Sequence, residues 1–223
     1  MSGAESKIAH DRDIREPLFD FLEEQYGKIR IIEEKMMGRS RADVVMVTED
    51  ALVGLEIKSD ADTYARLSRQ VKDYSRYFDY NFAVVGTSHA AHITEHVPEH
   101  FGIITVECIS DKMDFYILRK PRKSSDVEIS LKIQILWRPE LNMLLQQNGL
   151  PMYRQKSKQF VRRMLAESVS PDVLNRQISE QLFERDYNTI EEQIETFREE
   201  MTKKRRAKKQ RTKKQRTKKR SIR

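Results

Sequence analysis

Residues 42–58 read ADVVMVTEDALVGLEIK and predict two short β-strands joined by a tight turn. Valine, isoleucine and leucine are frequent on both sides of Glu49-Asp50, and strands are rich in such residues. A third run of this kind lies upstream. MGRS at residues 37–40 separates it from the first of these two strands. Loops this short favour an antiparallel meander. The three strands are expected at residues 28–34, 42–48 and 52–58.

A helix is expected immediately before the meander, at residues 13–26, where apolar residues recur at helical spacing. Pro17 places the start of its regular part near Glu16, because proline is tolerated in a first turn. Gly27 ends it. The apolar positions are Ile14, Leu18, Phe21 and Leu22.

A second helix follows the meander, and Ser59 or Asp60 can cap it. Its apolar stripe consists of Tyr64, Leu67, Val71, Tyr74 and Phe78. Residues 82–85 and 102–106 then read as strands on either side of a helical stretch at 88–96. The order α-β-β-β-α-β-α-β predicts an α/β fold with a mixed central sheet.

The remaining chain is helical in pattern and ends in a run of positive charge. Helices are expected at residues 139–147, 155–168, 171–184 and 189–202. The net charge of the chain is +7. The last 21 residues carry 14 basic and no acidic side chains, so the residues before them have a net charge of −7. Such a dense run of like charge is expected to be disordered. We therefore divide the chain into a core (12–120), a mostly helical extension (121–202) and a Lys/Arg-rich tail (203–223).

Composition excludes several classes of protein. A single cysteine, Cys108, rules out an internal disulfide or a thiolate metal cluster. None of the seven glycines lies in a phosphate-loop pattern. The N-terminus is polar and no apolar run approaches the ~18 residues of a membrane span. We expect no membrane association and a cytoplasmic location, nucleoid-associated or virus-encoded in a bacterial host, or nuclear in a eukaryote.

The informative constellation is Asp43 followed thirteen residues later by Glu56-Ile57-Lys58. Alternate side chains share a face of a strand, so Glu56 and Lys58 project to one side. Asp43 on the neighbouring strand can present its carboxylate to the same side. An upstream acid, Glu33 or Glu34, can join them; alternation puts these two on opposite faces, and Glu34 is favoured.

Carboxylates gathered in this way predict a divalent metal site, because Mg²⁺ prefers oxygen ligands and takes one or two carboxylates. The expected ligands are Asp43, Glu56, the backbone carbonyl of Ile57 and Glu34. Such a metal activates water and polarises phosphate, and Lys58 can balance the developing charge. Gln70, on the second helix, can point an amide at the same site. The alternatives are an exposed Glu56–Lys58 ion pair and, for Gln70, the polar edge of an amphipathic helix.

The spacing Asp43–x12–Glu56-Ile57-Lys58, with Gln70-Val71-x-x-Tyr74 on the next helix, resembles the PD-(D/E)XK nuclease superfamily. It is most similar to its small Holliday-junction-resolvase-like and VRR-NUC-like branches, although no proline precedes Asp43. The resemblance implies a restriction-endonuclease-like αβββαβ core and hydrolysis of phosphodiester bonds that leaves a 5′-phosphate. It also implies Mg²⁺ or Mn²⁺ as cofactor, Asp43 and Glu56 as metal ligands and Lys58 as the catalytic lysine.

Clusters of basic residues predict contact with nucleic-acid phosphates. Such contacts release counterions, so the binding is expected to depend steeply on salt. They lie beside the constellation, on the 155–168 helix and in a tandem KKQRT repeat of the tail. The candidates are Arg41, Arg66, Arg154, Lys156, Lys158, Arg162, Arg163, Lys208, Lys209, Arg211, Lys213, Lys214 and Arg216. The alternative interpretation of the tail is a segment that only increases the solubility of the protein.

The sequence thus predicts a Mg²⁺- or Mn²⁺-dependent nuclease, an endonuclease or an exonuclease, acting on DNA in preference to RNA. A homodimer is one assembly that it allows. The first alternative is a catalytically silent protein that binds nucleic acid and keeps the nuclease fold. The second is a helical protein whose acidic and basic ends assemble with other chains.

Overall fold

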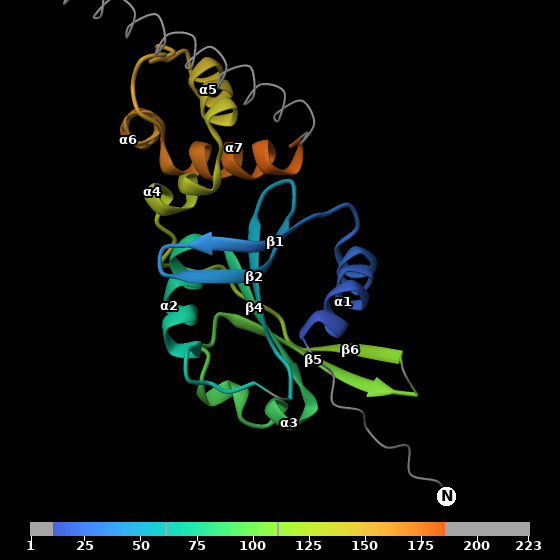
Figure 1. Cartoon of the computed structure of the whole chain (residues 1–223). Helices are drawn as coiled ribbons and strands as arrows, with labels where there is room; N and C mark the ends of the chain where they lie inside the picture. Colours follow the sequence, from blue (N-terminus) through green and yellow to red (C-terminus); the bar gives the residue numbers. More distant parts are fainter. Residues whose placement is uncertain (1–10, 61, 111, 186–223) are drawn as a thin grey trace, which may run out of the picture.

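The computed structural model describes residues 11–60, 62–110 and 112–185, and its centre is one mixed six-stranded sheet (Figure 1). The strands lie in chain order: β1 (Arg30–Met37), β2 (Ser40–Val47), β3 (Leu52–Lys58), β4 (Tyr80–Gly86), β5 (Phe101–Ile109) and β6 (Lys112–Arg119). The first three form the predicted antiparallel meander. Strands β3, β4 and β5 run parallel, and β6 returns antiparallel. The α/β class predicted from the sequence is therefore confirmed.

Helix α1 (Asp11–Tyr26) covers one face of the sheet. Its fully buried Ile14, Leu18 and Leu22 pack in one cluster with residues of β2 to β5. The expectation that its regular part begins near Glu16 is wrong, because the helix already runs from Asp11 through Pro17. Pro17 therefore lies in the second turn of the helix, where it removes one backbone hydrogen bond.

Helix α2 (Leu67–Tyr77) covers the opposite face, as the left-hand helix of Figure 1. It begins later than predicted, and neither Ser59 nor Asp60 caps it. The backbone N–H and hydroxyl of Ser59 donate to Asp62 Oδ2 at 2.9 and 2.7 Å, which closes a turn before the helix. The amphipathic stripe itself packs on the sheet through Leu67, Tyr74 and Phe78.

Two other segments differ from prediction. The helical stretch expected at 88–96 is a four-residue helix, α3 (Thr87–Ala90), and a single 3-10 turn, η1 (Ile93–Glu95). Strand β6 was not predicted; its positions alternate between exposed and half-buried, and none is fully buried. It adds an edge to the sheet.

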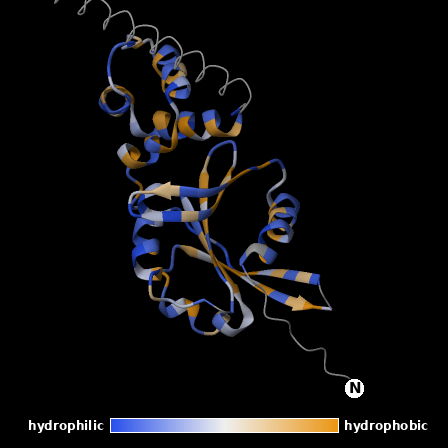
Figure 2. Ribbon diagram, viewed as in Figure 1, coloured by the Kyte–Doolittle hydropathy of each residue, from blue (hydrophilic) through white to orange (hydrophobic). Residues whose placement is uncertain are grey.

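The C-terminal helices extend the α2 face. They are α4 (Ile129–Lys132), the 3-10 turn η2 (Ile133–Ile135), α5 (Arg138–Gln147), α6 (Lys158–Ser168) and α7 (Pro171–Phe183). Their apolar residues join the hydrophobic cluster of α2 and β2 (Figure 2). The helix predicted at 189–202 and the basic tail lie outside the described residues. No helix among the described residues is long and apolar enough to cross a bilayer.

Candidate functional site

The site lies where β2 and β3 meet beneath α2. The strand register pairs Val44 with Leu55, which brings Asp43 next to Glu56. Glu56 and Lys58 project from β3 towards α2, on the same side as Gly54. A Cβ at Gly54 would lie 2.2 Å from the Phe78 ring, so the glycine lets α2 approach the strand closely.

Glu56 is the centre of the site and is 1% exposed. Its Oε1 accepts from Lys58 Nζ at 2.5 Å and from the Gln70 amide. Its Oε2 accepts from the Tyr74 hydroxyl at 2.8 Å. Lys58 is itself only 6% exposed, so this is a buried ion pair rather than a solvated pair on the sheet surface.

Asp43 supplies a second carboxylate. Its Oδ2 accepts from the backbone N–H of Ile57 at 2.9 Å, which fixes it beside Glu56. Burial and the negative charge of Glu56 raise the pKa of Asp43 to about 7. The Ile57 hydrogen bond and the Lys58 ammonium oppose that rise in pKa but do not cancel it. Two carboxylates therefore share one buried ammonium.

The upstream acids do not follow the predicted alternation. Glu33 and Glu34 both reach the guanidinium of Arg15, at 3.1 and 2.6 Å, instead of lying on opposite faces. Glu34 has a φ of +52°, which turns its side chain out of the strand pattern. It also pairs with Arg41 at 2.5 Å, so it does not join Asp43 and Glu56 as a third acid.

The donor set suits a hard divalent cation. Asp43 and Glu56 supply the one or two carboxylates that Mg²⁺ takes, and their mutual repulsion would be relieved by a positive ion. Gln70 Oε1 is buried and has no hydrogen-bond partner, so an acceptor in the site is left unused. Within residues 11–60, 62–110 and 112–185, no group of three or more His, Cys, Asp or Glu side chains converges, so most of the coordination would fall to water and substrate.

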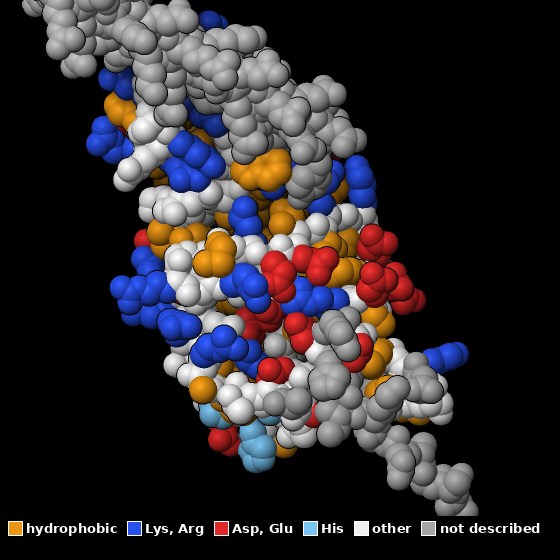
Figure 3. All heavy atoms as spheres, viewed as in Figure 1, with side chains coloured by type: hydrophobic (Ala, Val, Ile, Leu, Met, Phe, Trp, Pro, Cys, Tyr) orange, Lys and Arg blue, Asp and Glu red, His pale blue; other side chains and the backbone are white. Residues whose placement is uncertain are grey.

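Cations flank the site on the α2 side. Arg66 and Arg69 are exposed and have no ion pair in the described part of the chain. Figure 3 shows Lys and Arg side chains over α2 beside acidic side chains near β1 and β2. This rim gives the acidic site a positive border.

The other predicted contact residues lie elsewhere. Arg154 and Lys156 are exposed in the segment before α6, and Arg162 and Arg163 line a hollow on that helix. Lys158 is half-buried at the start of α6. The tail residues Lys208, Lys209, Arg211, Lys213, Lys214 and Arg216 lie outside the described residues.

Two site residues were not predicted. Tyr74 reads as part of an apolar stripe, yet its hydroxyl also accepts from Asp43 N at 3.2 Å and so touches both acidic residues. Burial and the charge of Glu56 raise the pKa of Tyr74 well above its usual value. Arg15 lies on α1. The sequence marks it only by its position as a basic residue among acidic neighbours.

Comparison with known proteins places the chain in a phage family. The family model described as bacteriophage P4 protein cII matches residues 4–212, and the chain belongs to that family. Protein cII of Enterobacteria phage P4 is 23% identical over 148 residues, which cover 65% of this chain and 56% of that protein. The aligned part thus spans little more than half of the phage protein.

One solved structure is similar to part of the chain. It is SfsA of Pyrococcus furiosus in complex with Ca²⁺, which is 15% identical and has a TM-score of 0.30. The similarity covers 50% of this chain and 61% of SfsA. At that TM-score the likeness does not define a shared fold.

Proposed function

We propose that the protein is a Mg²⁺- or Mn²⁺-dependent nuclease of the PD-(D/E)XK type, with Asp43 and Glu56 as metal ligands. The observation that carries the proposal is the buried contact of two carboxylates and one lysine from adjacent strands. Buried charges are costly unless they are paired or bind an ion, and here the negative charges exceed the positive ones. The observed order α1-β1-β2-β3-α2-β4 agrees with the core that this superfamily uses.

Each residue then has a distinct task. Asp43 and Glu56, with the Ile57 carbonyl, would hold the cation, which when bound supplies a Lewis acid for phosphate and water. Lys58 lies beside Glu56 and places its ammonium where negative charge develops on the phosphate. Water adds to phosphorus as the bond to the 3′ oxygen breaks, which leaves a 3′-hydroxyl and a 5′-phosphate.

Gln70 and Tyr74 act as positioning residues for Glu56. Both reach its carboxylate from one face of α2, four residues apart, and so fix its rotamer. The remaining amide oxygen of Gln70 is free to accept from a bound water. This support holds the carboxylate still without adding charge.

DNA in a bacterial host is the proposed substrate. The cationic rim of Arg66 and Arg69 can contact the phosphates next to the scissile one. The phage relative fits action in the cytoplasm of a bacterium. Residues 203–223, at +14, would raise the concentration of the protein on any polyanion.

A second candidate is a nucleic-acid-binding protein that keeps the fold and does not cleave. One observation favours it: Glu56 already accepts from Lys58, Gln70 and Tyr74, so its carboxylate is satisfied without a metal. In that case the site is a structural ion pair, and the rim alone carries the function.

Cleavage of labelled DNA separates the two candidates. Wild type, Lys58→Ala and the matched control Lys112→Ala, an exposed lysine of β6, are incubated with branched, linear and single-stranded DNA in Mg²⁺, Mn²⁺ or EDTA. We expect wild type and Lys112→Ala to cleave with metal, and Lys58→Ala to lose at least about 100-fold in rate. Equal rates for Lys58→Ala, or no metal-dependent cleavage of any substrate, would favour the second candidate.

A further inference from the structure

A second cluster of charge lies away from the candidate active site, between β1 and α6. It consists of Lys35 on β1 and of Lys158 and Arg162, one turn apart on α6. Burial and the neighbouring cations Arg162 and Lys35 lower the pKa of Lys158 to about 8. Burial and the charges of Arg185 and Arg162 likewise lower the pKa of Lys35. Lys35 Nζ and Arg162 Nη2 reach the carbonyls of the adjacent residues Ile135 and Gln134, and Lys158 lies one turn before Arg162 on α6, so the three cations lie close together.

The carboxylate nearest to this cluster is already used. Glu140 is 1% exposed and accepts from Arg185 Nε at 2.5 Å and from Arg185 Nη2 at 2.9 Å. It also accepts from the backbone N–H of Trp137 at 2.6 Å. Its charge is thus matched by Arg185, and Lys35, Lys158 and Arg162 are left in excess.

None of the three excess cations has an ion pair with a residue that the structure describes. Lys35 donates to the Ile135 carbonyl at 3.4 Å, and Arg162 Nη2 donates to the Gln134 carbonyl at 2.7 Å. Arg162 Nε is buried with no partner. Lys158 has no hydrogen bond within the described ranges. Neutral carbonyls do not cancel three charges, and uncompensated buried charge is costly.

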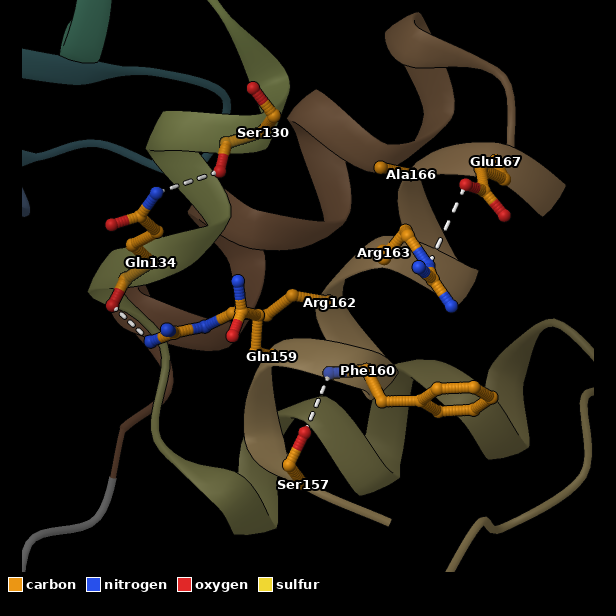
Figure 4. Close-up of a pocket in the computed structure, with 9 residues that line it drawn as sticks. All are labelled: Ser130, Gln134, Ser157, Gln159, Phe160, Arg162, Arg163, Ala166 and Glu167. Atoms are coloured by element: carbon orange, nitrogen blue, oxygen red, sulfur yellow. Dashed lines mark hydrogen bonds and ion pairs between the residues drawn. The ribbon is translucent and has the colours of Figure 1, made fainter.

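An open hollow of about 900 Å³ adjoins the cluster, between α4–η2 on one side and α6 on the other (Figure 4). Arg162 belongs both to the cluster of cations and to the wall of the hollow. Ser130, Gln134, Ser157 and Gln159 give the hollow a polar, uncharged wall. These groups can hydrogen-bond to phosphate oxygens without attracting or repelling charge.

Two further features suit an anion. Ser157 caps α6, an eleven-residue helix, so the positive end of its dipole adds to Lys158 and Arg162. The one carboxylate in the wall, Glu167, is exposed and lies 3.8 Å from Arg163. The wall as a whole is therefore not acidic.

We propose that Lys35, Lys158 and Arg162 bind a phosphate group of a nucleic-acid strand at the edge of the hollow on α6, where Arg162 lines the wall. Arginine matches the geometry of phosphate oxygens, and lysines act beside it as point charges. The inference deepens the proposed function, because it takes nucleic acid as the ligand. Lys35 pairs across the sheet with Ala42, the residue before Asp43, so a strand held here would run past the edge of the candidate active site.

The test measures binding without cleavage. The full chain is titrated into fluorescently labelled duplex DNA in EDTA at several salt concentrations, so that failure of the nuclease proposal leaves this result interpretable. The variant is Lys158→Gln with Arg162→Gln. The control is Lys112→Gln with Lys120→Gln, which removes two exposed cations that lie outside the cluster.

We expect the cluster variant to lose about tenfold in affinity and to reduce the slope of log K against log salt by about two, while the control changes little. Equal losses in both variants would overturn the proposal, since they would show diffuse attraction only. Unchanged affinity in the cluster variant would overturn it as well. Residues 203–223 are common to all proteins tested and cancel in the comparison.

A second measurement guards against misfolding and separates the sources of phosphate. Inorganic phosphate should raise the melting temperature of wild type but not of the cluster variant, and Lys35→Gln should weaken the same response. Stabilisation by inorganic phosphate with unchanged DNA affinity would show a site for a free phosphate, which contradicts a nucleic-acid ligand.

Discussion

Among the residues that the structure describes, two acid–lysine pairs are buried, and they are built differently. Asp79 and Lys132 join the sheet to the C-terminal helices, and both are almost fully buried. Asp79 also accepts from Leu52 N at 2.8 Å and from Asn175 Nδ2 at 3.1 Å, while Lys132 donates to Asn175 Oδ1 at 2.6 Å. One acid meets one base, and the surrounding groups complete the network.

The charges around Glu56 and Lys58 are not matched one to one in this way. A second carboxylate, Asp43, lies beside it with a pKa raised to about 7, and Gln70 leaves a buried oxygen without a partner. A pair that serves only stability has no use for a surplus acid. The comparison indicates that Asp79–Lys132 serves stability, whereas the Glu56 site is incomplete by itself.

The largest predicted effect concerns the closed pair. Lys132→Met should lower the free energy of unfolding by about 3–5 kcal/mol, because it leaves Asp79 buried without a cation. Urea denaturation measures the change. Lys112→Met, at an exposed position, is the control and should shift stability by less than about 0.5 kcal/mol. A loss below about 1 kcal/mol for Lys132→Met would remove the contrast between the two pairs.

The opposite sign is expected at the open site. Asp43→Asn should raise the free energy of unfolding at pH 8 by about 1–2 kcal/mol, because it removes a charge that burial and Glu56 disfavour. Asp114→Asn, at an exposed position of β6, is the matched control. Destabilisation by Asp43→Asn would mean that Asp43 is structural.

The pH dependence of stability sharpens this test. The folded-state pKa of Asp43, about 7, lies above its unfolded value near 4. Its stabilising contribution is therefore complete below about pH 4 and is lost as pH rises to about 7. Unfolding free energies of wild type and Asp43→Asn, measured from pH 4 to 8, should diverge over that range. Parallel curves would contradict the raised pKa.

The smallest effect concerns the support from α2. Tyr74→Phe should lower the free energy of unfolding by about 1 kcal/mol, because Glu56 keeps Lys58 and Gln70 as donors. Chemical denaturation of Tyr74→Phe checks this, with Tyr116→Phe, an exposed tyrosine, as control. A loss as large as that of Lys132→Met would show that Tyr74, and not Lys58, holds Glu56.

The fold could be predicted where local pattern and burial agree. The predicted third strand, residues 52–58, coincides with β3, because both faces of that strand are covered and most of its residues are apolar. The start of α2 could not be predicted, because the Ser59–Asp62 turn offers the backbone a competing arrangement. The cover provided by α4 to α7 depends on contacts between distant parts of the chain.

The site could be predicted only as a pattern. Strand alternation and spacing were enough to bring Asp43, Glu56 and Lys58 together. They could not show that Glu34, at φ +52°, turns to Arg15 and Arg41. They also gave no sign that a tyrosine in an apolar stripe would reach a buried glutamate, since that depends on how closely α2 packs.

Calorimetric titration of Mn²⁺ at pH 8 tests the central claim most directly. Wild type and Asp114→Asn should each bind Mn²⁺ at one site, and Asp43→Asn should lose that binding. Binding of Mn²⁺ to Asp43→Asn with the same affinity as to wild type would contradict the claim. A wild type that binds no Mn²⁺ in the presence of uncleavable DNA would contradict it as well.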